Sequence, residues 1–121
     1  MREELLKKIG NPTVRKKLGS LLNNGLSLDE GHIRELVSRE IESSYLQVFP
    51  TVGEREILKN MNIEMSKAEN LFLIVEGNPN LHWKATELVS TVTERSDAKV
   101  VWNFSPSNNR DRILKIIALS Y

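Results

Sequence analysis

The chain has 121 residues and a formal net charge of +1, with 40% apolar and 27% charged residues. This balance is typical of one folded globular domain and excludes a disordered chain. The small net charge argues against a nucleic-acid-binding protein, which usually carries a clear basic excess. The densest basic cluster, Arg15-Lys16-Lys17, does not change this, because its side chains would point in several directions on a helix.

The first 25 residues predict an N-terminal segment of two helices. Leucine and isoleucine at helical spacing predict the first over residues 2–9. Asn11 is a favourable N-cap and Pro12 suits the first helical position, so a second helix is expected to begin there. Gly25 is expected to end it in a left-handed conformation.

A third helix and a first strand are predicted next. Ser27 and Glu30 have the spacing of a capping box, which predicts a helix start at this point. The apolar residues at helical spacing that form its inner face are Ile33, Leu36, Val37 and Ile41. A strand is predicted over residues 45–49, and a short helix from Gly53 to Met61.

The second half predicts a buried strand followed by an amphipathic helix. Residues 71–75 are apolar at every position, which is typical of a central strand covered on both faces. Residues 77–80 form a turn, and a helix is predicted over residues 81–95. Its core-facing residues are expected to be Ala85, Leu88, Val89 and Val92.

Two further strands, over residues 99–103 and 113–119, are separated by a polar loop. That loop is too short for a usual parallel crossover, so the strands are expected to be antiparallel if they pair directly. The predicted order is α-α-α-β-α-β-α-β-β, which indicates an α+β fold with a four-stranded mixed sheet and packed helices. Residues 1–121 are predicted to form one domain, with an N-terminal helical segment (1–25) and a sheet domain (26–121).

Three motifs follow one another in the second half. Residues 77–81 read Gly-Asn-Pro-Asn-Leu, residues 98–103 read Ala-Lys-Val-Val-Trp-Asn, and residues 112–121 form a mostly apolar chain end. Over residues 66–121 their order resembles the C-terminal domain of FtsZ, the tubulin-like cell-division GTPase. That family has Gly-Gly-Pro-Asp-Leu, then Ala-Asn-Ile-Ile-Phe-Gly, then a similar closing strand. The resemblance implies the fold of the FtsZ or tubulin C-terminal domain.

An upstream loop carries a weaker part of the resemblance. FtsZ has Asn-x-Asp-Phe-Ala-Asp followed by Val or Ile after its long central helix. In that family this loop enters the nucleotide site of the next subunit, where its acids help the attacking water. The candidate interaction loop of this chain contains Ser27, Leu28, Asp29, His32 and Ile33. Asp29 and Ile33 match the pattern, whereas His32 replaces the second acid. Imidazole does not reproduce a carboxylate's charge beside phosphate and metal, so we expect a loop without catalytic function.

The glycine-rich loop with which FtsZ holds GTP has no counterpart. The six glycines are scattered and no Walker-type motif occurs. We therefore expect no GTP binding of the family type, no enzyme activity, no catalytic residue and no cofactor. The chain is expected to be either a stand-alone C-terminal-type domain or an excised piece of a longer protein, and the methionine at position 1 favours the first.

Other kinds of site find little support. The chain has no cysteine, which excludes disulfides and thiolate metal sites and fits a cytoplasmic protein. Two histidines distant in sequence, His32 and His82, are a weak basis for a zinc site, so no metal is predicted. No membrane span or signal peptide is predicted. Trp83 and Trp102 are expected in or near the core.

Three functional hypotheses remain. The first is an interaction module that binds, caps or regulates a filament of a full-length FtsZ or tubulin-like GTPase in cell division, or that self-associates. The second is a trimeric enzyme or ligand-binding protein resembling the chorismate-mutase-like fold, in which Arg95, Arg110 and Arg112 would bind a carboxylate. The third is a structural domain adapted to another partner.

Overall fold

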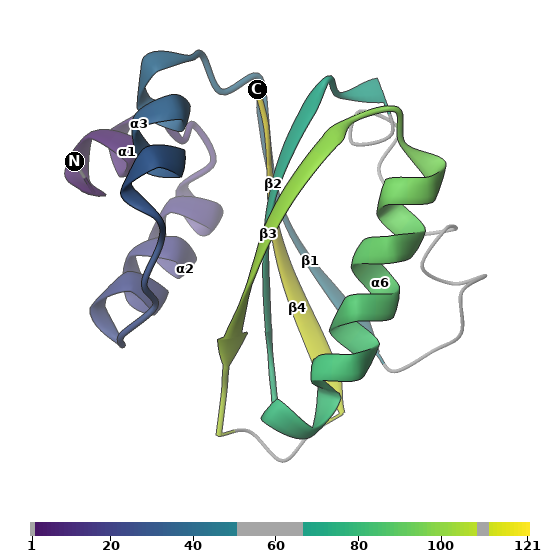
Figure 1. Cartoon of the computed structure of the whole chain (residues 1–121). Helices are drawn as coiled ribbons and strands as arrows, with labels where there is room; N and C mark the ends of the chain where they lie inside the picture. Colours follow the sequence, from purple (N-terminus) through teal and green to yellow (C-terminus); the bar gives the residue numbers. More distant parts are fainter. Residues whose placement is uncertain (1, 51–66, 109–111) are drawn as a thin grey trace.

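A four-stranded mixed sheet forms the centre of the computed structural model, which describes residues 2–50, 67–108 and 112–121 (Figure 1). The α+β fold expected from the sequence is confirmed. The elements are α1 (Arg2–Lys8), α2 (Pro12–Asn23), α3 (Glu30–Ser38), β1 (Ser43–Pro50), β2 (Asn70–Gly77), the 3-10 helix η1 (Pro79–Leu81), α6 (His82–Arg95), β3 (Lys99–Pro106) and β4 (Ile113–Ser120). The helix predicted from Gly53 to Met61 lies outside the described residues.

The strand order is β1-β4-β2-β3, so β2 is an inner strand, as its apolar run predicts. Strand β4 is antiparallel to β1 and to β2, whereas β2 and β3 are parallel. The last two strands therefore do not pair directly, because β2 lies between them. The physical reason is burial: residues 116–119 of β4 are buried on both faces and need an inner place, whereas β3 is only partly buried and lies at the edge.

Helices cover both faces of this sheet, with α1, α2 and α3 on one side and α6 on the other (Figure 1). Successive residues of a strand point to opposite faces. Phe72 and Ile74 accordingly pack in the cluster that contains the N-terminal helices. Leu71, Leu73 and Val75 pack in the cluster that contains α6. The central strand thus joins two cores.

The predicted ends of α2 are confirmed. The side-chain oxygen of Asn11 accepts hydrogen bonds from the backbone N–H of Thr13 (2.9 Å) and Val14 (3.3 Å), and Pro12 is the first helical residue. Gly25 follows the helix with φ of +102°, a conformation that glycine adopts without the strain of a Cβ atom.

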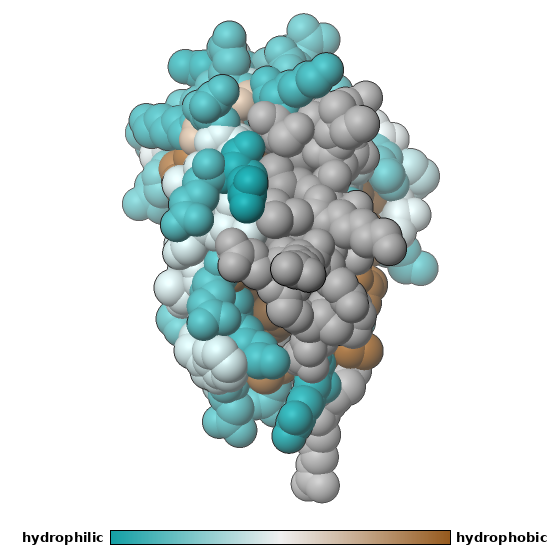
Figure 2. Space-filling view, turned by 90° about the vertical axis from the view of Figure 1, so that its right-hand side faces the viewer, coloured by the Kyte–Doolittle hydropathy of each residue, from teal (hydrophilic) through white to brown (hydrophobic). Residues whose placement is uncertain are grey.

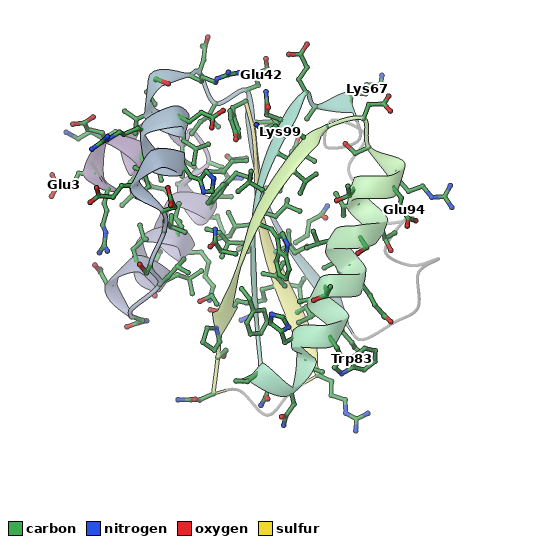
Figure 3. All side chains as sticks on the ribbon, in the orientation of Figure 1. Glu3, Glu42, Lys67, Trp83, Glu94 and Lys99 are labelled. Atoms are coloured by element: carbon green, nitrogen blue, oxygen red, sulfur yellow. The ribbon has the colours of Figure 1, made fainter. Side chains whose placement is uncertain are left out.

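Two sequence predictions at the other end of the molecule need correction. Trp83 is 56% exposed instead of lying near the core, because α6 begins at His82 and turns this side chain away from the sheet (Figure 3). Strand β3 continues to Pro106, beyond its predicted end, since Ser105 and Pro106 stay in parallel register with Glu76 and Gly77. Trp102 is partly buried against the α6 core, as expected.

Candidate functional site

The candidate interaction loop connects α2 to α3 and is fixed at both ends. The backbone N–H of Leu26 donates to the carbonyl oxygen of Leu21 at 3.0 Å, which closes the chain after α2. Leu26 and Leu28 are both buried in the core on the side of the N-terminal helices. These anchors hold the backbone between them close to the protein surface.

Asp29 caps the following helix. Its Oδ1 accepts hydrogen bonds from the backbone N–H of Gly31 (2.7 Å) and His32 (3.3 Å). The helix therefore begins after Asp29, and Ser27 is not its N-cap, contrary to the capping-box prediction. The carboxylate is the better cap because its negative charge also meets the positive end of the helix dipole.

Ile41, predicted on the inner face of this helix, lies beyond its end at Ser38.

The five predicted loop residues divide between surface and core. Ser27 and Asp29 are exposed, whereas Leu28 and Ile33 are buried. Two neighbours that the sequence pattern did not select, Glu30 and Gly31, are also exposed. The loop therefore offers a partner a small polar surface with two adjacent carboxylates.

His32 is only partly exposed and packs on the sheet. Its ring lies edge-on to Phe72 of β2, with 6.4 Å between ring centroids. Its Nδ1 is buried without a hydrogen-bond partner among the described residues. This position holds the imidazole against the core.

Neither a metal site nor the predicted arginine cluster is found in the described part of the chain. No group of three or more His, Asp or Glu side chains there has the arrangement of a metal site. Arg95 ends α6 near the first residues of β3, whereas Arg112 precedes β4 near the other end of the sheet. The structure does not bring these two arginines together, and Arg110 lies outside the described residues. The two described arginines of the carboxylate-binding alternative therefore lie apart.

A surface groove that the sequence did not predict runs between α6 and β3. It has a volume of about 400 Å³, and its apolar lining comes from Val89, Val100 and Trp102. The hydroxyl side chains of Thr86, Ser90 and Thr93 and the carboxylate of Glu94 complete the lining. The apolar residues of β3 were a usable signal for a strand, but the exposure of that strand depends on the strand order.

The surface on the α6 side is mainly hydrophilic where it is coloured, and brown patches are small (Figure 2). No helix of the described residues is long and apolar enough to cross a membrane.

Comparisons with solved structures find proteins with a similar fold. An FtsZ dimer from M. jannaschii matches with a TM-score of 0.56 at 14% identity, and the match covers 99% of this chain and 43% of that chain. The W319Y mutant of the same FtsZ matches with a TM-score of 0.56 at 15% identity, over 98% of this chain and 44% of that chain. This chain has an FtsZ-like fold.

That likeness extends beyond the sequence resemblance. The motifs resemble FtsZ mainly over residues 66–121, whereas the structural match includes nearly the whole chain and therefore the N-terminal helices. It is consistent with a domain of the FtsZ C-terminal type. The chain spans less than half the length of the FtsZ chains that it matches. No protein-family model matches the sequence, and no curated protein matches it.

Proposed function

We propose that this domain is a non-catalytic interaction module that binds a filament of an FtsZ-type GTPase and caps or regulates it. The observation that carries the proposal is the FtsZ-like fold of almost the whole chain. The missing glycine-rich phosphate loop supports the non-catalytic part, since backbone N–H groups of such a loop hold the phosphates of a bound nucleotide. Such a module would supply one of the two contacts that a filament subunit needs.

The loop between α2 and α3 is the proposed contact. Asp29 and Glu30 are exposed at the start of α3, and buried Leu26 and Leu28 anchor the backbone before them. A loop held in this way loses little conformational freedom on binding, which favours affinity. Its carboxylates would meet cationic or amide groups on the nucleotide-bearing face of the partner.

The same geometry supports binding without activation of hydrolysis. Oδ1 of Asp29 already accepts two backbone hydrogen bonds, and the imidazole of His32 packs against Phe72. A catalytic loop needs groups that can orient the attacking water or accept its proton. We therefore expect a bound module to block the subunit end without accelerating GTP hydrolysis.

The test is co-sedimentation with a full-length FtsZ-type protein that polymerises with GTP. Over a range of molar ratios the chain is expected to enter the pellet, shorten the polymers and leave the GTPase rate per subunit unchanged or lower. The double variant Asp29→Asn/Glu30→Gln removes both charges while asparagine still caps α3. It should bind about tenfold more weakly, as expected when interface charges are removed.

Glu94→Gln is the matched control, because it removes an exposed carboxylate from α6 on the opposite face of the sheet. It should bind like the unmodified chain. Unchanged polymer mass and length at every ratio would reject the proposal. Faster GTP hydrolysis in the presence of the module would reject its non-catalytic part.

A further inference from the structure

One side of β3 has no partner among the described strands, and the hydrogen-bonding groups on that side can be assigned. The backbone N–H of Lys99 donates to the carbonyl oxygen of Glu69 (2.9 Å), and that of Ser107 donates to Gly77 (2.8 Å). The accepting residues, Glu69 and Gly77, adjoin β2 or belong to it. The backbone N–H and C=O groups of the odd-numbered residues of β3 therefore point toward β2. Along a strand, the backbone N–H and C=O groups of successive residues point to alternate sides. The backbone groups of Val100, Trp102 and Phe104 therefore point away from β2. None of the described strands pairs with that side of β3.

The same three residues place their side chains on the α6 face. Val100, Trp102 and Phe104 are each partly exposed and pack against the α6 core. Pro106, the next even-numbered residue of β3, has no backbone N–H and therefore leaves no donor unpaired at an open edge. An uncovered strand with apolar side chains is a template for pairing with another strand.

We propose that β3 pairs with β3 of a second copy of this chain, antiparallel about a two-fold axis through Trp102. In this register Trp102 lies opposite Trp102 of the second copy, and Val100 lies opposite Phe104 in both directions. All three pairs join residues with open backbone groups, so each pair exchanges two hydrogen bonds. Aromatic pairs and aromatic–β-branched pairs are favourable across strands.

Charge also fits this register. Lys99 carries the one charge within β3, and it would lie opposite Ser105 of the second copy instead of another lysine. On the face of the N-terminal helices, Val101 would lie opposite Asn103. The strand thus meets its own sequence without like charges in contact, which is what an isologous interface requires.

Helix α6 is suited to lie beside its symmetry mate. Thr86, Ser90 and Thr93 are exposed, line the groove and lie at helical spacing on one side of α6. The hydroxyl groups of Thr86 and Thr93 already donate to the carbonyl oxygens of His82 (3.1 Å) and Val89 (2.8 Å). Burial of these two threonines would therefore leave neither hydroxyl donor unsatisfied.

The two-fold pairing would extend the sheet to eight strands and close the groove between the two α6 helices. This interface is separate from the loop between α2 and α3, so it does not depend on the proposed function.

Sedimentation of the full chain alone, from micromolar to millimolar concentration, tests the proposal. A reversible shift from 13.8 kDa to twice that mass is expected. Ser90→Lys should weaken the dimer by about tenfold or more, because it places two lysines near the axis. Ser20→Lys, an exposed serine of α2, is the matched control and should dimerise normally. A monomer at all concentrations, or equal effects of both variants, overturns the proposal.

The register has its own test, made clean by the absence of native cysteine. Chains with Val101→Cys and chains with Asn103→Cys are mixed and oxidised. The mixture should form disulfide-linked dimers faster than either variant alone, because only the mixed pair places the two thiols directly opposite. Equal rates in all three samples would overturn β3 pairing even if a dimer forms. Circular dichroism of each variant shows that it is folded.

Discussion

The Nζ atom of Lys17 lies 2.9 Å from a carboxylate oxygen of Glu76, and this ion pair joins α2 to the central strand β2. Glu76 is only 9% exposed, and Lys115 of β4 is its register partner on the same face of the sheet. The carboxylate therefore forms an ion pair with one lysine and has a second lysine as its cross-strand neighbour. A buried charge requires such partners, since its desolvation is costly.

Removal of one partner of this pair should destabilise the fold. Lys17→Met is expected to lower the free energy of unfolding by about 1–3 kcal/mol, because it leaves a largely buried carboxylate with less compensation. The double variant Lys17→Met/Glu76→Gln should lose less than the sum of the two single variants. Urea unfolding of the four proteins measures this coupling.

Arg34→Met provides the control for that cycle. Arg34 and Glu30 form an exposed pair with 4.0 Å between nitrogen and oxygen. Its loss should change the stability by about 0.5 kcal/mol or less. An equal loss for Lys17→Met and Arg34→Met would show that the pair on β2 contributes no more than a surface pair.

The cap of α3 gives a second prediction. Asp29→Ala should destabilise the protein by about 1 kcal/mol, because the backbone N–H groups of Gly31 and His32 lose their acceptor. Asp29→Asn should be close to neutral, and Ser27→Ala should have little effect because Ser27 is not the cap. Thermal unfolding followed by circular dichroism compares the three. A larger loss for Ser27→Ala would restore the capping-box interpretation.

Two exposed glycines distinguish conformational strain from steric contact. An added Cβ atom at Gly10 or at Gly25 would meet nothing within 4 Å, but only Gly25 of the two has positive φ. Gly25→Ala should therefore cost about 1 kcal/mol, whereas Gly10→Ala should be neutral or stabilising because it restricts the unfolded chain. Chemical unfolding gives both values. Equal losses would contradict the left-handed conformation at Gly25.

The last residue gives a prediction about pH. Burial raises the pKa of Tyr121 above its usual value of 10.0; the nearby Glu35 carboxylate also raises it, and Arg39 lowers it. A raised folded-state pKa means that the folded protein holds this proton more tightly than the unfolded chain. The contribution of this tyrosine to the free energy of unfolding is present below pH 10 and is lost as pH rises through its folded-state pKa. Tyr121→Phe should reduce this alkaline loss.

Glu35→Gln tests the cause of that shift directly. It removes one of the two influences that raise the pKa of Tyr121, so the tyrosine should ionise at lower pH. Arg39→Gln should act in the opposite direction. Absorbance of the phenolate, with Tyr121→Phe to isolate the signal of Tyr45, measures both changes. A pKa that does not respond to either variant would leave burial as the sole cause.

Local signals in the sequence were sufficient where neighbouring residues determine the conformation. Asn11 and Pro12 start α2, and Gly25 follows it, because caps and left-handed turns involve residues a few positions apart. The unbroken apolar run of β2 likewise predicts an inner strand. Asp29 and Ser27 show the limit of such signals, since both are acceptable caps and only the structure shows which one accepts the N–H bonds.

The sequence by itself determined the α+β class, the start of α2 and the absence of clustered glycines, because each depends on residue type and short-range spacing. Tertiary structure decided that β2 separates β3 from β4, that His32 packs on Phe72, and that Trp83 faces solvent. It also decided which backbone groups of β3 stay open. These features depend on which distant segments share a core, and burial of β4 on both faces leaves β3 at the edge.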